Sequence, residues 1–150
     1  MRELTRTALV SFSPAQMFAL VDDIARYPEF LPWLTAATEL KRTETERVGR
    51  LTISRAGLSE EITTRNIVQS PTRLAMQLIE GPFNVLEGTW TFAAIDDDQG
   101  IARGTRIKLE VRFEFKSRLT ELLLGRVFES SCDTLVDAFT RRAQQIYSRA

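Results

Sequence analysis

The chain has 150 residues, no histidine and one cysteine, and its 20 basic and 20 acidic residues give a net charge of zero. This length predicts one domain over residues 1–150 and a core that folds without disulfides, and the lack of histidine excludes His-based triads and His metal sites. Zero charge argues against DNA binding, and with one thiol, no secretory segment and no apolar run of about 20 residues we expect a cytoplasmic protein.

The N-terminal region predicts a strand over 4–12 and then a helix. Ser13, Pro14 and Gln16 form a helix-start pattern, in which serine caps and glutamine completes a capping box. Pro28 is expected to end that helix. The segment 27–33, YPEFLPW, follows as a turn or short helix that is unusually apolar for a connection. We expect it to cover one end of an interior cavity; the alternative is a plug that packs on the core without touching a ligand.

The middle of the chain predicts a run of antiparallel strands with short connections. The predicted strands cover residues 51–55, 61–69, 73–79, 86–95 and 105–115. The last of these alternates strictly between apolar and charged residues, which is typical of a strand with one buried and one wet face. The acidic groups Asp22/Asp23 and Asp96–Asp98 are interpreted as solvated surface, because no histidine or cysteine accompanies them.

A long helix is predicted over residues 117–148. An apolar stripe at helical spacing is formed by Leu124, Phe128, Cys132, Leu135, Phe139, Ala143 and Ile146. Leu119, Leu122, Leu123 and Val127 fall on a different side, and Gly125 stands where the phase changes. Because glycine weakens a helix by roughly 1 kcal/mol relative to alanine, we expect a bend or break there.

These elements predict an α+β fold in which a curved antiparallel sheet of six or seven strands grips the C-terminal helix. A sheet with one apolar face must cover that face, and one helix does not fill a wide curved sheet. The arrangement therefore predicts space between the sheet and the helix.

Several segments in chain order resemble one known family. They are RTALV (6–10), YPEFLP (27–32), AGLSEEITTRN (56–66), EGPFNVLEGTWTF (80–92), FEF (113–115) and GRVFE (125–129). The chain resembles the coenzyme-Q-binding proteins of the START-like (helix-grip) superfamily, which includes the bacterial ribosome-association toxin and polyketide cyclase/dehydrase-like proteins. The resemblance implies a deep apolar cavity that binds a quinone or another lipid without chemistry.

The candidate site residues follow from the patterns and the resemblance together. The expected cavity residues are Phe30, Leu31, Trp33, Phe83, Trp90, Phe92, Leu109, Val111, Phe113, Phe128 and Leu135. Thr64 and Asn66 are polar ligand contacts if their strand face points inward, and are solvated if it points outward. Leu122, Leu123 and Gly125 are expected to form a gate beside residues 27–33; the alternative is a helix end packed under loops.

The leading functional hypothesis is noncatalytic binding of ubiquinone or another isoprenoid lipid, with no catalytic residue, no metal and no required cofactor. Transient contact with the inner membrane would accompany it. The alternative is a protein that binds the large ribosomal subunit through a basic patch. Candidate patch residues are Arg106, Lys108, Arg112, Arg126, Arg141, Arg142 and Arg149. A polyketide cyclase is a third hypothesis, which no evident acid–base pair supports.

Overall fold

The computed structural model describes residues 1–55 and 57–148. This part of the chain contains seven strands, two α-helices and one 3₁₀ helix. In chain order they are β1 (Arg2–Val10), α1 (Pro14–Asp22), η1 (Ile24–Glu29), β2 (Leu34–Arg42), β3 (Glu46–Arg55), β4 (Leu58–Gln69), β5 (Arg73–Glu80), β6 (Phe83–Asp96), β7 (Ala102–Phe115) and α2 (Arg118–Tyr147). Arg149 of the proposed basic patch lies outside the described residues.

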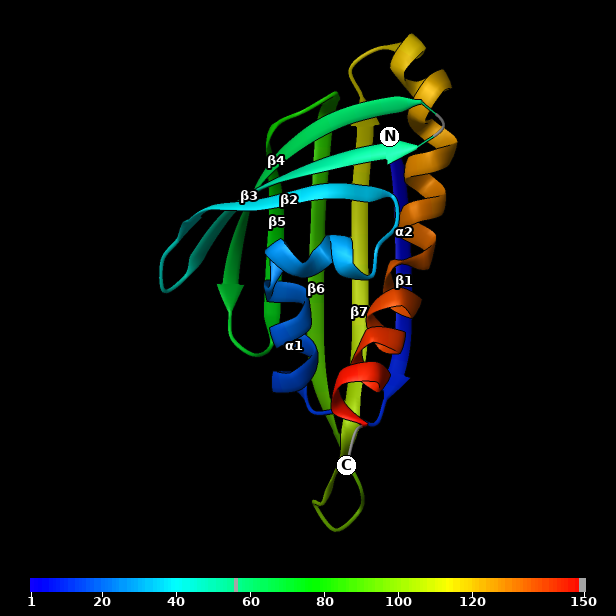
Figure 1. The fold of residues 1–150 in the computed structure, drawn as a ribbon. Coiled ribbons are helices and arrows are strands. Elements are labelled where there is room, and N and C mark those ends of the chain that lie inside the picture. Colours follow the sequence, from blue (N-terminus) through cyan, green and yellow to red (C-terminus); the bar gives the residue numbers. More distant parts are fainter. Residues whose placement is uncertain (56, 149–150) are drawn as a thin grey trace.

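The strands form one antiparallel sheet in the order β1-β7-β6-β5-β4-β3-β2. Strands β2 to β7 are therefore a meander, and β1 closes the far edge by pairing with β7. Figure 1 shows β2–β4 curling across the front of the upright strands β5–β7, with α1, η1 and α2 on the concave side. The predicted fold, a strongly curved sheet gripping a long C-terminal helix, is confirmed.

Alternation along β7 positions the core as predicted. Ile107, Leu109, Val111 and Phe113 are all buried, and the charged residues between them face solvent. The buried stripe of α2 continues through Phe139 and Ala143, but the expectation for Ile146 is wrong because its side chain is exposed. Tyr147 takes that place: its ring packs 5.8 Å from that of Phe12, and its hydroxyl donates to the Gln16 carbonyl.

The first helix starts as predicted and ends early. Ser13 Oγ accepts from the Gln16 amide at 3.2 Å, and Gln16 Oε1 accepts from the Ser13 amide at 2.9 Å, which completes the capping box. The helix ends at Asp22, and Pro28 lies inside the separate helix η1. Strand β2 is not among the predicted strands; it is an edge strand whose residues are mostly exposed, so it shows no clear apolar alternation.

Helix α2 is continuous across Gly125, so of the two alternatives expected there, a bend or a break, the break is wrong. Ser117 caps its start, and it runs uninterrupted from Arg118 to Tyr147 (Figure 1). A Cβ added at Gly125 would lie 3.7 Å from Glu121 Cγ and 3.9 Å from Phe115 Cε2, which are ordinary contacts. The change of phase in the apolar pattern has another cause: Leu119, Leu122 and Leu123 before Gly125 are exposed and do not pack on the sheet.

Asp22 is buried in an ion-pair network, and its interpretation as solvated surface is wrong. Arg47 holds it with two bonds, Nε to Oδ1 at 3.0 Å and Nη2 to Oδ2 at 3.2 Å. Arg42 adds a third, from Nη1 to Oδ2 at 3.2 Å. Since Asp22 ends α1 and both arginines lie on the β2–β3 hairpin, the network fastens that hairpin to the helix.

Candidate functional site

A cavity of about 110 Å³ lies between the concave face of the sheet, the η1 segment and α2. Its walls are mostly apolar side chains from β2 to β7 and α2. The lining residues are Ile24, Tyr27, Leu31, Trp33, Leu34, Leu51, Ile53, Ile62, Thr64, Asn66, Leu74, Met76, Leu86, Gly88, Trp90, Leu109, Val111, Phe128, Ser131, Cys132, Leu135 and Phe139.

Trp90 on the sheet and Phe139 on α2 form two facing parts of the cavity wall. Trp90 projects inward from β6, and its ring meets the edge of the Phe139 ring of α2 at a centroid distance of 5.2 Å. Phe139 also meets Tyr27 at 5.4 Å and Phe30 at 5.1 Å, so one ring connects the helix, the sheet and the 27–33 segment. These contacts fix the cavity's shape on the side of η1.

Asn66 brings an unused hydrogen-bond donor to this apolar space. Thr64 and Asn66 lie on the inner face of β4 and are buried, with 3% and 4% exposure. Thr64 Oγ1 donates to Asn66 Oδ1 at 3.5 Å. Among the described residues, no atom accepts a hydrogen bond from Asn66 Nδ2. A ligand atom that accepts a hydrogen bond would satisfy this amide.

The other polar groups of the wall are already satisfied or hold their protons tightly. Ser131 Oγ donates to the Val127 carbonyl at 2.7 Å, and the Tyr27 hydroxyl donates to the Val21 carbonyl. Burial, followed by the charges of Asp22 and Asp23, raises the pKa of Tyr27 well above its usual value. Burial raises the pKa of the Cys132 thiol to about 12, with Asp133 and Glu129 adding to the shift.

Nine of the expected site residues line the cavity: Leu31, Trp33, Thr64, Asn66, Trp90, Leu109, Val111, Phe128 and Leu135. The other four cavity candidates are packing residues around it. Phe92 lies behind Trp90 and meets the edge of Phe18, and Phe83 and Phe113 belong to an aromatic cluster with Phe115 and Phe128. Phe30 packs outside, with the Arg142 guanidinium 5.1 Å above its ring.

Sequence reasoning missed several wall residues. Leu51 and Ile53 alternate on β3, and this alternation was a usable signal for the inner face. Gly88 lines the wall opposite Met76, whose Cε would lie 3.1 Å from a Cβ at that position, so the glycine leaves room for the methionine. Ser131 carried no signal, because a serine on a long helix is ordinarily solvated.

The structure does not bring the two parts of the expected gate together. Residues 29–33 face α2 across a groove of about 490 Å³ whose helical wall begins only at Ser130. Leu122 and Leu123 lie near the other end of the helix and are exposed. Leu31, Trp33 and Ser131 line both this groove and the cavity, so they form the partition between the two spaces.

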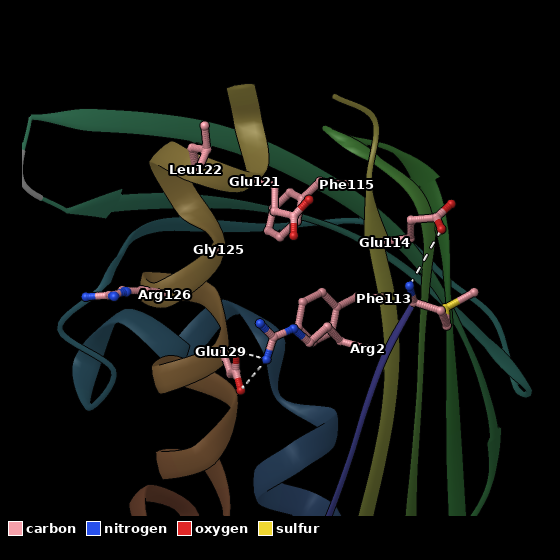
Figure 2. Close-up of a pocket in the computed structure, with 10 residues that line it drawn as sticks. Arg2, Phe113, Glu114, Phe115, Glu121, Leu122, Gly125, Arg126 and Glu129 are labelled. Carbon is pink, nitrogen blue, oxygen red and sulfur yellow. Dashed lines mark hydrogen bonds and ion pairs between the residues drawn. The ribbon is translucent and has the colours of Figure 1, made fainter. Parts of the chain in front are cut away.

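A second cleft, of about 200 Å³, lies between the start of α2 and strands β1 and β7. Figure 2 shows Phe113 and Phe115 between the helix and the sheet, with charged groups around them. Arg2 pairs with Glu129 at 2.8 Å, and the N-terminal amine lies 3.7 Å from Glu114. These pairs join β1 to its neighbours, so the cleft is accounted for by packing between the helix and the sheet edge.

Residues 10–140 match the family described as polyketide cyclase/dehydrase and lipid transport. The chain belongs to this family. Among solved structures, a START superfamily protein from Mycobacterium smegmatis has the same fold, with a TM-score of 0.78 at 17% identity over 96% of this chain and 98% of that one.

Two relatives of this chain are named for different functions. The ribosome association toxin RatA of Vibrio cholerae is 42% identical over 98% of this chain and 99% of that protein. The mitochondrial coenzyme Q-binding protein COQ10 of Drosophila melanogaster is 26% identical over 96% of this chain and 59% of that protein. The resemblance to a START-like family that includes both kinds of protein is therefore confirmed.

Proposed function

We propose that this chain binds a hydrophobic ligand in the cavity without transforming it, and that the ligand carries a hydrogen-bond acceptor such as a quinone carbonyl. The single observation that carries the proposal is the apolar cavity between sheet and helix, with the Asn66 amide in its wall free to donate. The wall offers Tyr27 and Cys132, whose raised pKa values keep them protonated near neutral pH, which supports binding rather than proton transfer.

The size of the cavity limits what enters without rearrangement. Its volume of about 110 Å³ is below the roughly 150 Å³ that holds a benzene molecule and the roughly 300 Å³ at which ligand pockets begin. Since Trp33 and Leu31 separate it from the larger groove, movement of these side chains would join the two spaces. Only in the joined space would a quinone ring fit, at the cavity end, with its isoprenoid tail along the groove.

Replacing Asn66 tests the proposal. Both tryptophans of the chain, Trp33 and Trp90, line the cavity, so their fluorescence reports a bound quinone directly. We expect a short-chain ubiquinone to quench the wild-type protein, and Asn66→Leu to weaken that binding about tenfold, the value of one hydrogen bond of about 1.4 kcal/mol. The same substitution is expected to lower the free energy of unfolding by no more than about 1 kcal/mol, because it removes the oxygen that accepts the long hydrogen bond from Thr64 Oγ1.

Two comparisons make this experiment decisive. Asn84→Leu, the same change at an exposed position of β6, should alter neither property. An alkylbenzene, which has no acceptor, should bind the wild type and Asn66→Leu equally. If Asn66→Leu binds the quinone as tightly as the wild type, the assigned hydrogen bond is wrong. If the quinone does not quench the wild-type protein at all, the ligand proposal itself is wrong.

A second candidate function is association with the large ribosomal subunit, in the cytoplasm, which the name and 42% identity of the V. cholerae relative favour. The sheet's outer face supplies cations for it. Arg73, Thr91 and Lys108 form one cross-strand row, with Arg106 next along β7. Within the described residues, neither Arg73 nor Arg106 lies within 4.0 Å of a carboxylate, so both are available to phosphate groups.

Sedimentation with purified large subunits tests this candidate. We expect Arg73→Ala with Arg106→Ala to weaken cosedimentation and to make its dependence on salt less steep by about two counterions. Arg50→Ala is the control, because Arg50 pairs with Glu61 at 3.8 Å. Unchanged cosedimentation of the double variant would move the contact elsewhere on the molecule.

A further inference from the structure

The first turns of α2 carry three leucines that face water. Leu119, Leu122 and Leu123 are 66%, 75% and 51% exposed. They stand at positions i, i+3 and i+4, so they share one face of the helix. Single exposed apolar residues are ordinary on a protein surface, but adjacent leucines at this exposure form a patch that requires a partner.

The core does not use these leucines. The neighbouring residues Leu124, Val127 and Phe128 turn toward the sheet and close its end against Pro82 and Phe83. The expectation that Val127 shares the side of the three leucines is therefore wrong. Figure 2 shows Leu122 directed away from the rings of Phe113 and Phe115. The sequence LTELLLG therefore has two apolar faces for two purposes: one covers the sheet, and the other lies open.

The unpaired charges around the patch are mostly positive. Residues 114–129 contain three cations, Lys116, Arg118 and Arg126, and three acids, Glu114, Glu121 and Glu129. Glu114 and Glu129 are paired with the N-terminal amine and with Arg2. All three cations are exposed, and within the described residues none lies within 4.0 Å of a carboxylate. Figure 2 shows Arg126 projecting from α2 on the side away from Phe113. Exposed leucines with nearby cations match the chemistry of an anionic lipid surface, with acyl chains below and phosphate groups at the level of the cations.

We propose that the first turns of α2 dock on an anionic lipid bilayer, inserting Leu119, Leu122 and Leu123 while Lys116, Arg118 and Arg126 contact the headgroups. None of the helices in the described part of the chain is long and apolar enough to cross a membrane. The contact is therefore peripheral and reversible. It goes beyond the proposed ligand binding and does not require it. The docked end is the end of the sheet that Phe128 closes, and Phe128 also lines the cavity.

Vesicle flotation tests the proposal directly. Wild-type protein should float with vesicles of equal parts phosphatidylcholine and phosphatidylglycerol, much less with pure phosphatidylcholine, and less as salt rises. Leu119→Ser with Leu122→Ser should reduce binding to the anionic vesicles at least about tenfold, and Arg126→Gln about fivefold. Because these side chains are exposed, the variants should keep the wild-type circular dichroism spectrum.

The matched control is Ile146→Ser, at the other end of the same helix, where the side chain is 41% exposed. Its vesicle binding should equal that of the wild type. The proposal is overturned if wild-type protein ignores anionic vesicles, or if Ile146→Ser and the leucine variant lose binding equally. It is also overturned if the leucine variant loses only cosedimentation with ribosomal subunits, since the patch would then contact the ribosome. Failure of quinone binding leaves the flotation result unaffected.

Discussion

Replacing Asp22 by alanine is expected to cost about 3–5 kcal/mol of unfolding free energy. Asp22 and Arg47 are only 9% and 8% exposed, and Arg47 reaches both carboxylate oxygens. Without Asp22, the Arg47 guanidinium stays buried beside that of Arg42 with no carboxylate between them. The hairpin β2–β3 would then lose its fastening to α1. Chemical denaturation of the wild type and the variant measures the difference.

The adjacent residue provides the control for this effect. Asp23 pairs with Arg26 at 3.1 Å, but both side chains are about half exposed. Asp23→Ala should therefore change the unfolding free energy by less than about 1 kcal/mol. The double variant Asp22→Leu with Arg47→Met should recover much of the loss, because it removes both buried charges. Equal small effects of Asp22→Ala and Asp23→Ala would show that the network contributes little to stability.

This pair of aspartates illustrates what the sequence could and could not predict. Strand β7 was predictable because alternation with a period of two directly reflects which face of the strand is buried. Asp22 and Asp23 look alike in the sequence, since the partner that distinguishes them, Arg47, is 25 residues away on another element. Pairing across such a distance depends on the curl of the sheet, which no local pattern encodes.

The candidate site was predictable in the same uneven way. Trp90, Leu109 and Val111 followed from strand alternation, and they line the cavity. For Thr64 and Asn66, the sequence left open whether their strand face points into the cavity or to solvent. Polar residues that line a cavity look the same in the sequence as polar residues that face water. The break expected at Gly125 is wrong for a related reason: the change of phase marks an exposed leucine patch, and the helix continues through this residue.

Phe139 is the second position where we expect a large effect. Its ring is 1% exposed and contacts Tyr27, Phe30 and Trp90, so Phe139→Ala should cost about 3–5 kcal/mol. The lost ring also adjoins the cavity, so the variant should contain an enlarged apolar space. If Phe139→Ala does not fold, Phe139→Leu gives the same direction with a smaller loss.

Small aromatic ligands distinguish this cavity from ordinary loss of packing. Toluene should raise the melting temperature of Phe139→Ala, since a ligand at about 100 times its Kd stabilises the folded state by about 2.7 kcal/mol. Phe12→Ala, which removes a half-buried ring that packs on Tyr147 away from the cavity, should show no such rescue. Phe139 also holds Tyr27 and Phe30 of the segment that covers the cavity, so its removal should speed quinone exchange. If Phe139→Ala is instead less stable, gains nothing from toluene and exchanges quinone at the wild-type rate, then Phe139 is a packing residue with no role in the cavity.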